Sequence, residues 1–183
     1  MKIPSSVKVS ISGIRGLAPS DLTPQLAGAF ARAHCEHFSV KKLVISRDTR
    51  KTGKTFRDAI YANLQNLNYT SLKNSSYLSR KNLNIQIFDL DIAPLPTTQL
   101  AVEEFHADAG ICITASHNPA EYNGLKLLNA EGEFISEQDI EAIVELMNSY
   151  ENAMISGGTT DLNVDMTTVQ QGCLLYTSDA ADE

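Results

Sequence analysis

The sequence predicts an α/β domain in which helices flank both faces of a mainly parallel, mixed sheet. Three observations support this fold class. Apolar, strand-like runs alternate along the chain with segments whose apolar residues recur at helical spacing. Residues 110–114 form a continuous apolar run, which is typical of a strand buried on both faces. Polar loops follow several of these runs, and the carboxyl ends of strands are where such sheets bind ligands.

Short segments rich in β-branched or other apolar residues, and bounded by turn-forming residues, are predicted to be strands. In chain order they are residues 7–11, 43–45, 85–90, 110–114, 123–128 and 133–135. The last two flank the turn-forming stretch 129–132, which predicts an antiparallel pair. The first ends at the Gly-flanked SGIRG segment, residues 12–16, which we interpret as a turn.

The helical spacing of apolar residues predicts helices that extend over about residues 24–38, 55–67, 98–105 and 136–146. Thr23 is placed to cap the first of these helices, and Pro24 is suited to its first position. Thr97 or Thr98 is expected to cap the third. Ser136, followed three residues later by an acidic side chain, predicts a capped start for the fourth.

Three polar loops would meet at one rim of the sheet if the strands that precede them are parallel. They are SGIRG, SRDTR at residues 46–50 and TASHNP at residues 114–119. Residues 69–84 are rich in Ser, Asn and Lys and predict an irregular surface insertion or a long hairpin. After Asn148 the chain turns polar and Gly-rich, which is typical of an interdomain linker.

These patterns divide the chain into three parts. Residues 1–150 are predicted to form the domain, and residues 151–172 a linker with the start of a second, truncated domain. Residues 173–183, CLLYTSDAADE, continue no helical or strand pattern and resemble a translated sequencing adaptor. Our hypothesis is that the natural reading frame was cut near Gly172, so this tail is left out of the fold prediction.

Composition restricts the classes of partner. The formal charge is −7, from 15 Lys and Arg against 22 Asp and Glu, which argues against nucleic acid or an anionic membrane as a partner. No apolar run approaches the roughly 18 residues of a membrane-spanning helix. The N-terminus lacks the pattern of a signal peptide, and Cys35, Cys112 and Cys173 lack the spacing of a zinc site or a disulfide framework. We therefore expect a cytoplasmic protein with reduced thiols.

Ser116 is the leading candidate for a chemical role. It directly follows the apolar run at residues 110–114, so a rigid scaffold could present its hydroxyl at a strand end. On local chemistry alone, the alternative that Ser116, Asn118 and Pro119 simply build a turn is favoured. A serine-hydrolase site is not indicated, because Ala115 and His117 replace the glycines of the G-x-S-x-G motif.

The longer motif around Ser116 favours a chemical role over a simple turn. ITASHNPAEYNGLKLL, at residues 113–128, closely resembles the phosphoserine loop of the alpha-D-phosphohexomutase family. This family includes phosphoglucomutases, phosphomannomutases and phosphoglucosamine mutases. SGIRG, SRDTR and APLPTTQLA also match the family in order and approximate spacing, and the resemblance covers about residues 7–148. The chain would then be the first domain of a multi-domain phosphohexomutase.

The resemblance implies specific roles for the matching residues. Ser116 would carry a phosphoryl group, give it to a bound hexose phosphate and recover one from the bisphosphorylated intermediate. Ser116 or its phosphate would also be a ligand of Mg²⁺, which would neutralise developing charge. Arg15 would contact phosphate, and Lys126 would stabilise phosphate charge or take part in proton transfer. His117 would either assist acid–base steps or hold the loop, and both roles remain open.

The resemblance assigns structural roles to the other polar residues of these motifs. Asn118 and Asn123 are interpreted as loop-shaping, and Asp48 and Arg50 as structural partners rather than catalysts. The family's Asp-Gly-Asp-Gly-Asp metal loop occurs nowhere in the sequence. We therefore expect an N-terminal fragment of an intramolecular phosphotransferase that is inactive alone. The alternative is a stand-alone phosphosugar-binding or regulatory module, and neither the preferred sugar nor the oligomeric state is predicted.

Overall fold

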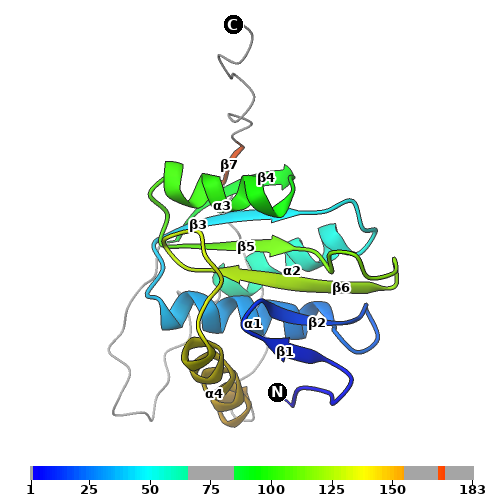
Figure 1. The fold of residues 1–183 in the computed structure, drawn as a ribbon. Helices are drawn as coiled ribbons and strands as arrows, with labels where there is room; N and C mark the ends of the chain where they lie inside the picture. Colours follow the sequence, from blue (N-terminus) through cyan, green and yellow to red (C-terminus); the bar gives the residue numbers. More distant parts are fainter. Residues whose placement is uncertain (1, 66–84, 155–168, 172–183) are drawn as a thin grey trace, which may run out of the picture.

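The computed structural model describes residues 2–65, 85–154 and 169–171, which form one sheet with helices on both faces (Figure 1). The strands are β1 (Lys8–Ser10), β2 (Gly13–Leu17), β3 (Lys42–Arg47), β4 (Gln86–Ile92), β5 (Ala109–Ile113), β6 (Tyr122–Leu128) and β7 (Val169–Gln171). The helices are α1 (Pro24–His37), α2 (Gly53–Gln65), α3 (Leu95–Glu104) and α4 (Glu137–Met154). The predicted α/β fold is confirmed.

The sheet is mixed, with strand order β1-β2-β6-β5-β3-β4-β7. Strands β5, β3, β4 and β7 pair in parallel, whereas β6 is antiparallel to both β5 and β2, and β1 is antiparallel to β2. The antiparallel part is therefore larger than the single antiparallel pair of strands that the sequence predicted. Because two antiparallel steps separate β2 from β5, these two strands run in the same direction.

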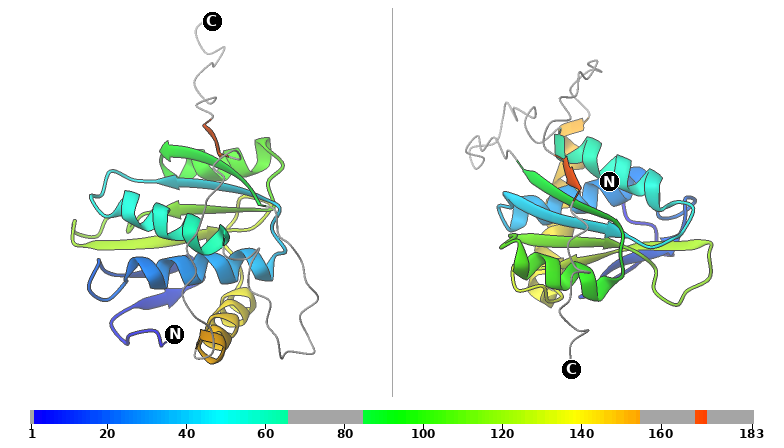
Figure 2. Two further views of the ribbon diagram at one scale, coloured as in Figure 1. Left: turned by 180° about the vertical axis from the view of Figure 1, so that it is seen from behind. Right: turned by 90° about the horizontal axis from the view of Figure 1, so that it is seen from above.

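The helices form the outer layers of the domain. Figure 2 shows α1 and α2 on one face of the sheet and α3 on the other, while α4 packs against α1. The larger apolar core lies on the α1 and α2 side and includes Phe30, Phe56 and Ile111, all fully buried. A smaller core lies beneath α3, around Val44 and Val102. None of the described helices is both long enough and apolar enough to span a membrane.

Two helix starts confirm the capping predicted from sequence. The Thr23 side chain accepts a hydrogen bond from the Leu26 N–H at 3.1 Å, and Pro24 is the first residue of α1. At the start of α4, the Asp139 N–H donates to Ser136 Oγ at 3.1 Å, and the Ser136 N–H donates back to Asp139 Oδ2 at 3.0 Å. These bonds satisfy first-turn donors that lack partners within a helix.

The SGIRG prediction was wrong. Gly13–Leu17 is strand β2, hydrogen-bonded to β1 on one side and to β6 on the other. The tight reversal at residues 11–12 lies just before it, and Gly13, the first residue of β2, has φ 103°, a conformation that favours glycine. Ser46 and Arg47, assigned to a loop, likewise belong to β3.

Three smaller predictions also differ from the structure. Pro94 rather than Thr97 or Thr98 is the N-cap of α3, and Thr98 lies in the first turn, where its hydroxyl donates to the Pro94 carbonyl. The expected strand at 133–135 is reduced to a single bridge between Leu128 and Phe134. Helix α4 continues eight residues beyond the predicted end, because Met147 continues its buried side while polar Asn148 and Ser149 lie on its exposed side.

Some predictions fall on parts of the chain that the structure does not describe. They are the end of the second helix at Leu67, the insertion at residues 69–84 and the tail at residues 173–183. In the predicted linker and second-domain segment, residues 151–172, the structure describes only the last turn of α4 and the short strand β7. The division of the chain into domains therefore stays a prediction.

Candidate active site

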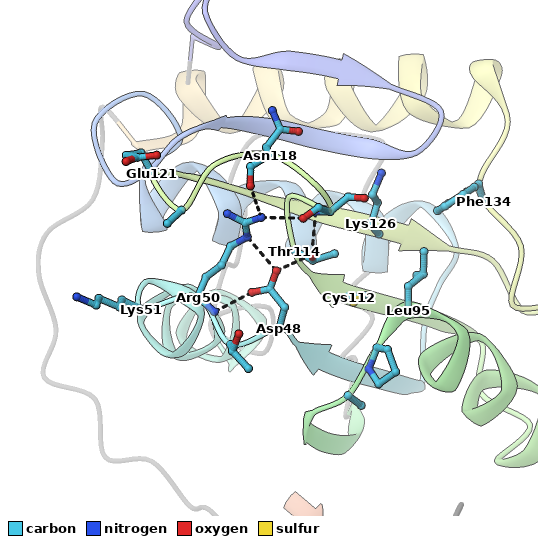
Figure 3. A pocket seen from close by; sticks show the side chains of 15 residues that line it. Asp48, Arg50, Lys51, Leu95, Cys112, Thr114, Asn118, Glu121, Lys126 and Phe134 are labelled. Carbon is cyan, nitrogen blue, oxygen red and sulfur yellow. Dashed lines mark hydrogen bonds and ion pairs between the residues drawn. The ribbon is translucent and has the colours of Figure 1, made fainter.

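Two predicted loops meet because β3 and β5 are adjacent and parallel. Arg47 at the end of β3 pairs with Ile113 at the end of β5, and the Asp48 N–H donates to the Ile113 carbonyl at 3.0 Å. The SRDTR and TASHNP segments thus leave the sheet side by side and border an open pocket of about 1050 Å³ (Figure 3). The polar side chains around this pocket include Asp48, Arg50, Lys51, Thr114, Ser116, Asn118, Glu121 and Lys126.

Ser116 is presented outward from this rim in a strained conformation. It is exposed, and its φ of 55° places it in the left-handed region that L-residues rarely adopt. Its N–H donates to Thr114 Oγ1 at 2.9 Å, and its Oγ lies 3.4 Å from His117 Nδ1. Such a conformation persists only where the surrounding structure fixes it, and it is enriched at functional sites.

Arg50 supplies much of that fixation. Its Nη2 group donates to the carbonyls of Ser116 and Asn118, both at 2.8 Å. Its Nη1 group donates to the carbonyls of Pro119 and Tyr122, at 2.6 and 3.0 Å. The Arg50 side chain is only 10% exposed. A single guanidinium therefore holds the main chain from the serine to the start of β6.

Asp48 connects this guanidinium to the other side of Ser116. Its Oδ2 accepts from Arg50 Nε at 2.9 Å and from the Thr114 hydroxyl at 2.6 Å, as dashed lines in Figure 3 show. The Thr114 hydroxyl oxygen in turn accepts the Ser116 N–H. The chain of bonds thus reaches Ser116 through its N–H and through its carbonyl.

Arg15 reaches the loop from the antiparallel side of the sheet. It lies on β2, opposite Gly124 of β6, and its Nη1 donates to Asn118 Oδ1 at 2.6 Å. A side chain at Gly124 would collide with the main-chain carbonyl oxygens of Ile14 and Thr114, so this close approach requires glycine. Arg15 therefore contacts the TASHNP loop although the SGIRG segment is not a loop itself.

Lys126 lies on β6 directly opposite Cys112 of β5 and lines the pocket. Partial burial lowers the pKa of Lys126 from its ordinary value, and the nearby positive charge of Arg15 lowers this pKa further. Its Nζ lies 5.5 Å from the centre of the Phe134 ring, within the range of a cation–π contact. The ammonium is thereby held at the pocket wall in a form that gives up its proton more readily than a free lysine.

The remaining candidates occupy peripheral or supporting positions. His117 is exposed beside the Ser116 hydroxyl. Asn123 is buried; its Nδ2 donates to Thr52 Oγ1 at 2.9 Å, and its Oδ1 accepts the Gly124 N–H at 2.8 Å. These bonds fix the start of β6 beneath the loop, as expected for a loop-shaping residue.

The described residues contain no cluster of three or more His, Cys, Asp or Glu side chains able to hold a metal ion. The nearest carboxylate to Ser116 along the bond network, Asp48, is already engaged by Arg50 and Thr114. The exposed Ser116 hydroxyl fits the role of a single metal ligand, either itself or through a phosphoryl oxygen. The other ligands of such an ion would have to come from residues outside this part of the chain.

Sequence reasoning missed two features of the pocket. One is Thr114, whose hydroxyl lies between Asp48 and Ser116; its place two residues before the serine was the available signal. The other is an apolar wall that includes Pro94, Leu95 and Phe134. This wall could not be inferred from local patterns, because Leu95 and Phe134 come from segments far apart in the sequence.

Comparison with known proteins identifies the class to which this fold and site belong. A family model described as phosphoglucomutase/phosphomannomutase, alpha/beta/alpha domain I, matches residues 7–154. The layered fold and the match together define an α/β/α domain of the hexose-phosphate mutases. The chain belongs to the phosphoglucomutase/phosphomannomutase family, which confirms the expected resemblance.

Individual relatives agree with this assignment. The chain is 36% identical over 138 residues to a phosphoglucomutase/phosphomannomutase of Thermococcus kodakarensis, covering 73% of this chain and 26% of that protein. It is 31% identical over 172 residues to a phosphoglucosamine mutase of Limosilactobacillus fermentum, covering 91% and 34%. The chain thus spans between about a quarter and a third of the length of these curated relatives.

A solved structure supports the fold. A phosphoglucomutase/phosphomannomutase family protein from Burkholderia thailandensis superposes with a TM-score of 0.60 at 21% sequence identity. The match covers 79% of this chain and 31% of that protein. At this level of identity the likeness establishes the architecture of the domain.

Proposed function

We propose that the protein to which this domain belongs is a phosphohexomutase, which interconverts hexose 1-phosphate and hexose 6-phosphate through a phosphoserine. The observation that carries the proposal is Ser116, an exposed serine held in a left-handed conformation at the rim of a polar pocket. Relatives named as phosphoglucosamine mutase and phosphoglucomutase/phosphomannomutase favour this enzyme over a stand-alone binding or regulatory module.

The proposed reaction transfers a phosphoryl group twice. The Ser116 Oγ–P bond breaks as a hydroxyl oxygen of the bound hexose phosphate forms a new bond to phosphorus, and the proton of that hydroxyl passes, directly or through a neighbouring side chain, to the departing Ser116 Oγ. The resulting hexose bisphosphate reorients and returns its other phosphoryl group to Ser116, which releases the isomeric monophosphate. Exposure of Ser116 at the pocket rim suits both steps, because the substrate must reach phosphorus in line with the bond that breaks.

The basic residues around Ser116 are suited to phosphate charge. Phosphoserine carries roughly −1.5 to −2 charge near neutral pH, so cationic surroundings stabilise it. We assign phosphate contact to Arg15, whose guanidinium already lies against the loop at Asn118. We assign Lys126 to charge stabilisation or proton transfer, because partial burial and the charge of Arg15 lower its pKa and make its proton easier to remove. His117, beside the Ser116 hydroxyl, assists these steps or supports the loop.

We further propose that Ser116 and its phosphoryl group contribute one ligand to Mg²⁺. When bound, this ion would supply Lewis-acid stabilisation of the charge on the transferred group. Within the proposed domain at residues 1–150, Ser116 is the assigned metal ligand. Hexose phosphates are the proposed substrates, and the cytoplasm, where these metabolites are processed, is the proposed location.

The test compares two serine variants of the complete protein. Hexose 1-phosphate is supplied with Mg²⁺ and a catalytic amount of hexose 1,6-bisphosphate, and formation of the 6-phosphate is measured for Ser116→Ala and Ser10→Ala. Ser10 is exposed on β1, and the only hydrogen bond of its hydroxyl within the described residues is to Ser12 Oγ. We expect the Ser116 variant to lose turnover and the Ser10 variant to keep it. Substantial turnover by Ser116→Ala would refute the proposed role.

A further inference from the structure

We propose that Arg50 is a positioning residue, whose guanidinium holds Ser116 in the conformation required for phosphoryl transfer without itself contacting the phosphate. This inference rests on the proposed mutase function for the transfer step. The holding of the loop is a separate, measurable property of the domain.

The hydrogen-bond inventory of Arg50 is the first argument. An arginine side chain has five N–H donors. Arg50 directs Nε to Asp48, both Nη1 donors to the carbonyls of Pro119 and Tyr122, and both Nη2 donors to those of Ser116 and Asn118. Five donors thus meet five acceptors, and no donor is left for a phosphate oxygen. This separates Arg50 from Arg15, whose only side-chain hydrogen bond in the described residues is to Asn118.

The conformation of Ser116 is the second argument. A left-handed conformation at a non-glycine residue costs roughly 1 kcal/mol or more and needs compensation from its surroundings. Here Arg50 binds the carbonyl of Ser116, while Thr114 and Asp48 hold its N–H. Both peptide units flanking the strained φ are therefore held, and both holds converge on the Asp48 carboxylate.

The shape of the side chain is the third argument. The four carbonyls come from one curved stretch of main chain, between Ser116 and Tyr122. A planar guanidinium can address them in pairs through its two terminal nitrogens. A lysine ammonium at position 50 would keep the charge but has three donors on one atom, so it could not replace this fork.

Arg57 provides a matched control within the same domain. It lies on α2 and pairs with Asp89, in the middle of β4, at 3.1 Å and with Asp91, near the end of that strand, at 3.3 Å. Like Arg50 it is a largely buried arginine, with 17% of its side chain exposed. It forms no hydrogen bond to the loop between Ser116 and Tyr122. A lysine ammonium at position 57 can still pair with these carboxylates. Arg57→Lys should therefore leave the loop between Ser116 and Tyr122 unchanged.

The first measurement is backbone ¹⁵N relaxation on the 183-residue chain, for wild type, Arg50→Lys and Arg57→Lys. In wild type and in Arg57→Lys we expect order parameters of about 0.85 at Ser116 and His117, as in rigid backbone. In Arg50→Lys they should fall below about 0.6. Unchanged order at Ser116 in Arg50→Lys would overturn the proposal.

A measurement without mutation keeps the proposal testable if Arg50→Lys does not fold. In the wild-type chain, four bound carbonyls should stop rotation of the Arg50 guanidinium, so its Nη protons should give separate, slowly exchanging NMR signals. Averaged, rapidly exchanging signals would contradict the bond pattern.

The second measurement addresses the transfer step in the complete protein. We expect Arg50→Lys to lower kcat by about 10²-fold, the loss typical of a misplaced reacting group, with a much smaller change in KM. Arg57→Lys should retain both values. Wild-type kcat in Arg50→Lys would remove the positioning role. If the wild-type protein shows no mutase turnover, the proposed function fails, whereas the relaxation data still decide whether Arg50 holds the loop.

Discussion

Two arginine–aspartate clusters lie on neighbouring parallel strands, one directly after β3 and one in the later half of β4, and their charges have different roles. In the first, after β3, Arg50 pairs with Asp48, and its other N–H groups donate hydrogen bonds to main-chain carbonyls. In the second, in the later half of β4, Arg57 pairs with Asp89 and Asp91. Each cluster also contains a residue in the left-handed conformation, Ser116 in the first and Asp91 in the second.

The first cluster supports the loop that carries Ser116, whereas in the second cluster opposite charges compensate one another. In the β4 cluster the cationic and anionic side chains mainly compensate one another, and Asp91 lies at a strand end, where aspartate tolerates a left-handed conformation. In the β3 cluster the side chains fix the path of a loop that carries an exposed hydroxyl. Similar ion pairs therefore contribute stability in one place and geometry in the other.

The largest effect on stability is expected from removing one carboxylate charge in either cluster. Asp48→Asn and Asp89→Asn each weaken hydrogen bonds to an arginine, so each should lower the free energy of unfolding by about 1.5–3 kcal/mol. Only Asp48→Asn should also lower the order parameter of Ser116, because only Asp48 connects Arg50 with Thr114. Denaturant unfolding and ¹⁵N relaxation measure the two properties. An equal fall of the Ser116 order parameter in both variants would show that the two clusters do not differ in their effect on the loop.

A smaller effect is expected from removing one hydroxyl. Thr114→Val breaks the link between Asp48 and the Ser116 N–H and should cost about 1 kcal/mol of stability. Thr98→Val is the matched control, because the Thr98 hydroxyl is buried in a 2.6 Å bond with Ser46 beneath the same rim. Amide hydrogen exchange should become faster at Ser116 in the first variant alone. Faster exchange there in Thr98→Val would show that loop order depends on general packing.

The smallest expected effect is on the protonation of Lys126. Arg15→Met removes a positive charge that lowers the Lys126 pKa, so the pKa should rise. It should remain below the ordinary value of about 10.4, because burial, the larger cause, is unchanged. NMR titration of the lysine side chain measures this shift, with Arg32→Met on α1 as the control. A Lys126 pKa that does not respond to Arg15 would separate these two residues electrostatically.

Much of the fold could be predicted because its signals are local. The apolar run at residues 110–114 and the capping residues Thr23 and Ser136 correctly placed β5 and the starts of two helices. Gly13–Leu17 was misjudged because two glycines in five residues imitate a turn, whereas the strand is stabilised by partners on both sides. The pairing of β2 with β6 involves residues more than 100 positions apart, so it cannot be predicted from a local sequence pattern.

The candidate site shows the same limit. Ser116, Arg15 and Lys126 could be singled out from the motifs that resemble the family, and the structure brings Ser116 and Lys126 to one pocket with Arg15 bound to the loop. The hydrogen bonds of Arg50 to four main-chain carbonyls could not be predicted, because these acceptors lie 66 to 72 residues further along the chain. Every residue has a main-chain carbonyl, so the side-chain sequence does not show which carbonyls an arginine will bind.

The position of the phosphoryl group on the protein decides whether Ser116 is the residue that carries it. The complete protein is incubated with hexose 1,6-bisphosphate and Mg²⁺, digested, and its phosphopeptides are sequenced by tandem mass spectrometry. We predict a single phosphoryl group on Ser116, which is lost when excess hexose 1-phosphate is supplied as acceptor. Phosphorylation of a different residue, with Ser116 unmodified while turnover proceeds, would contradict the account.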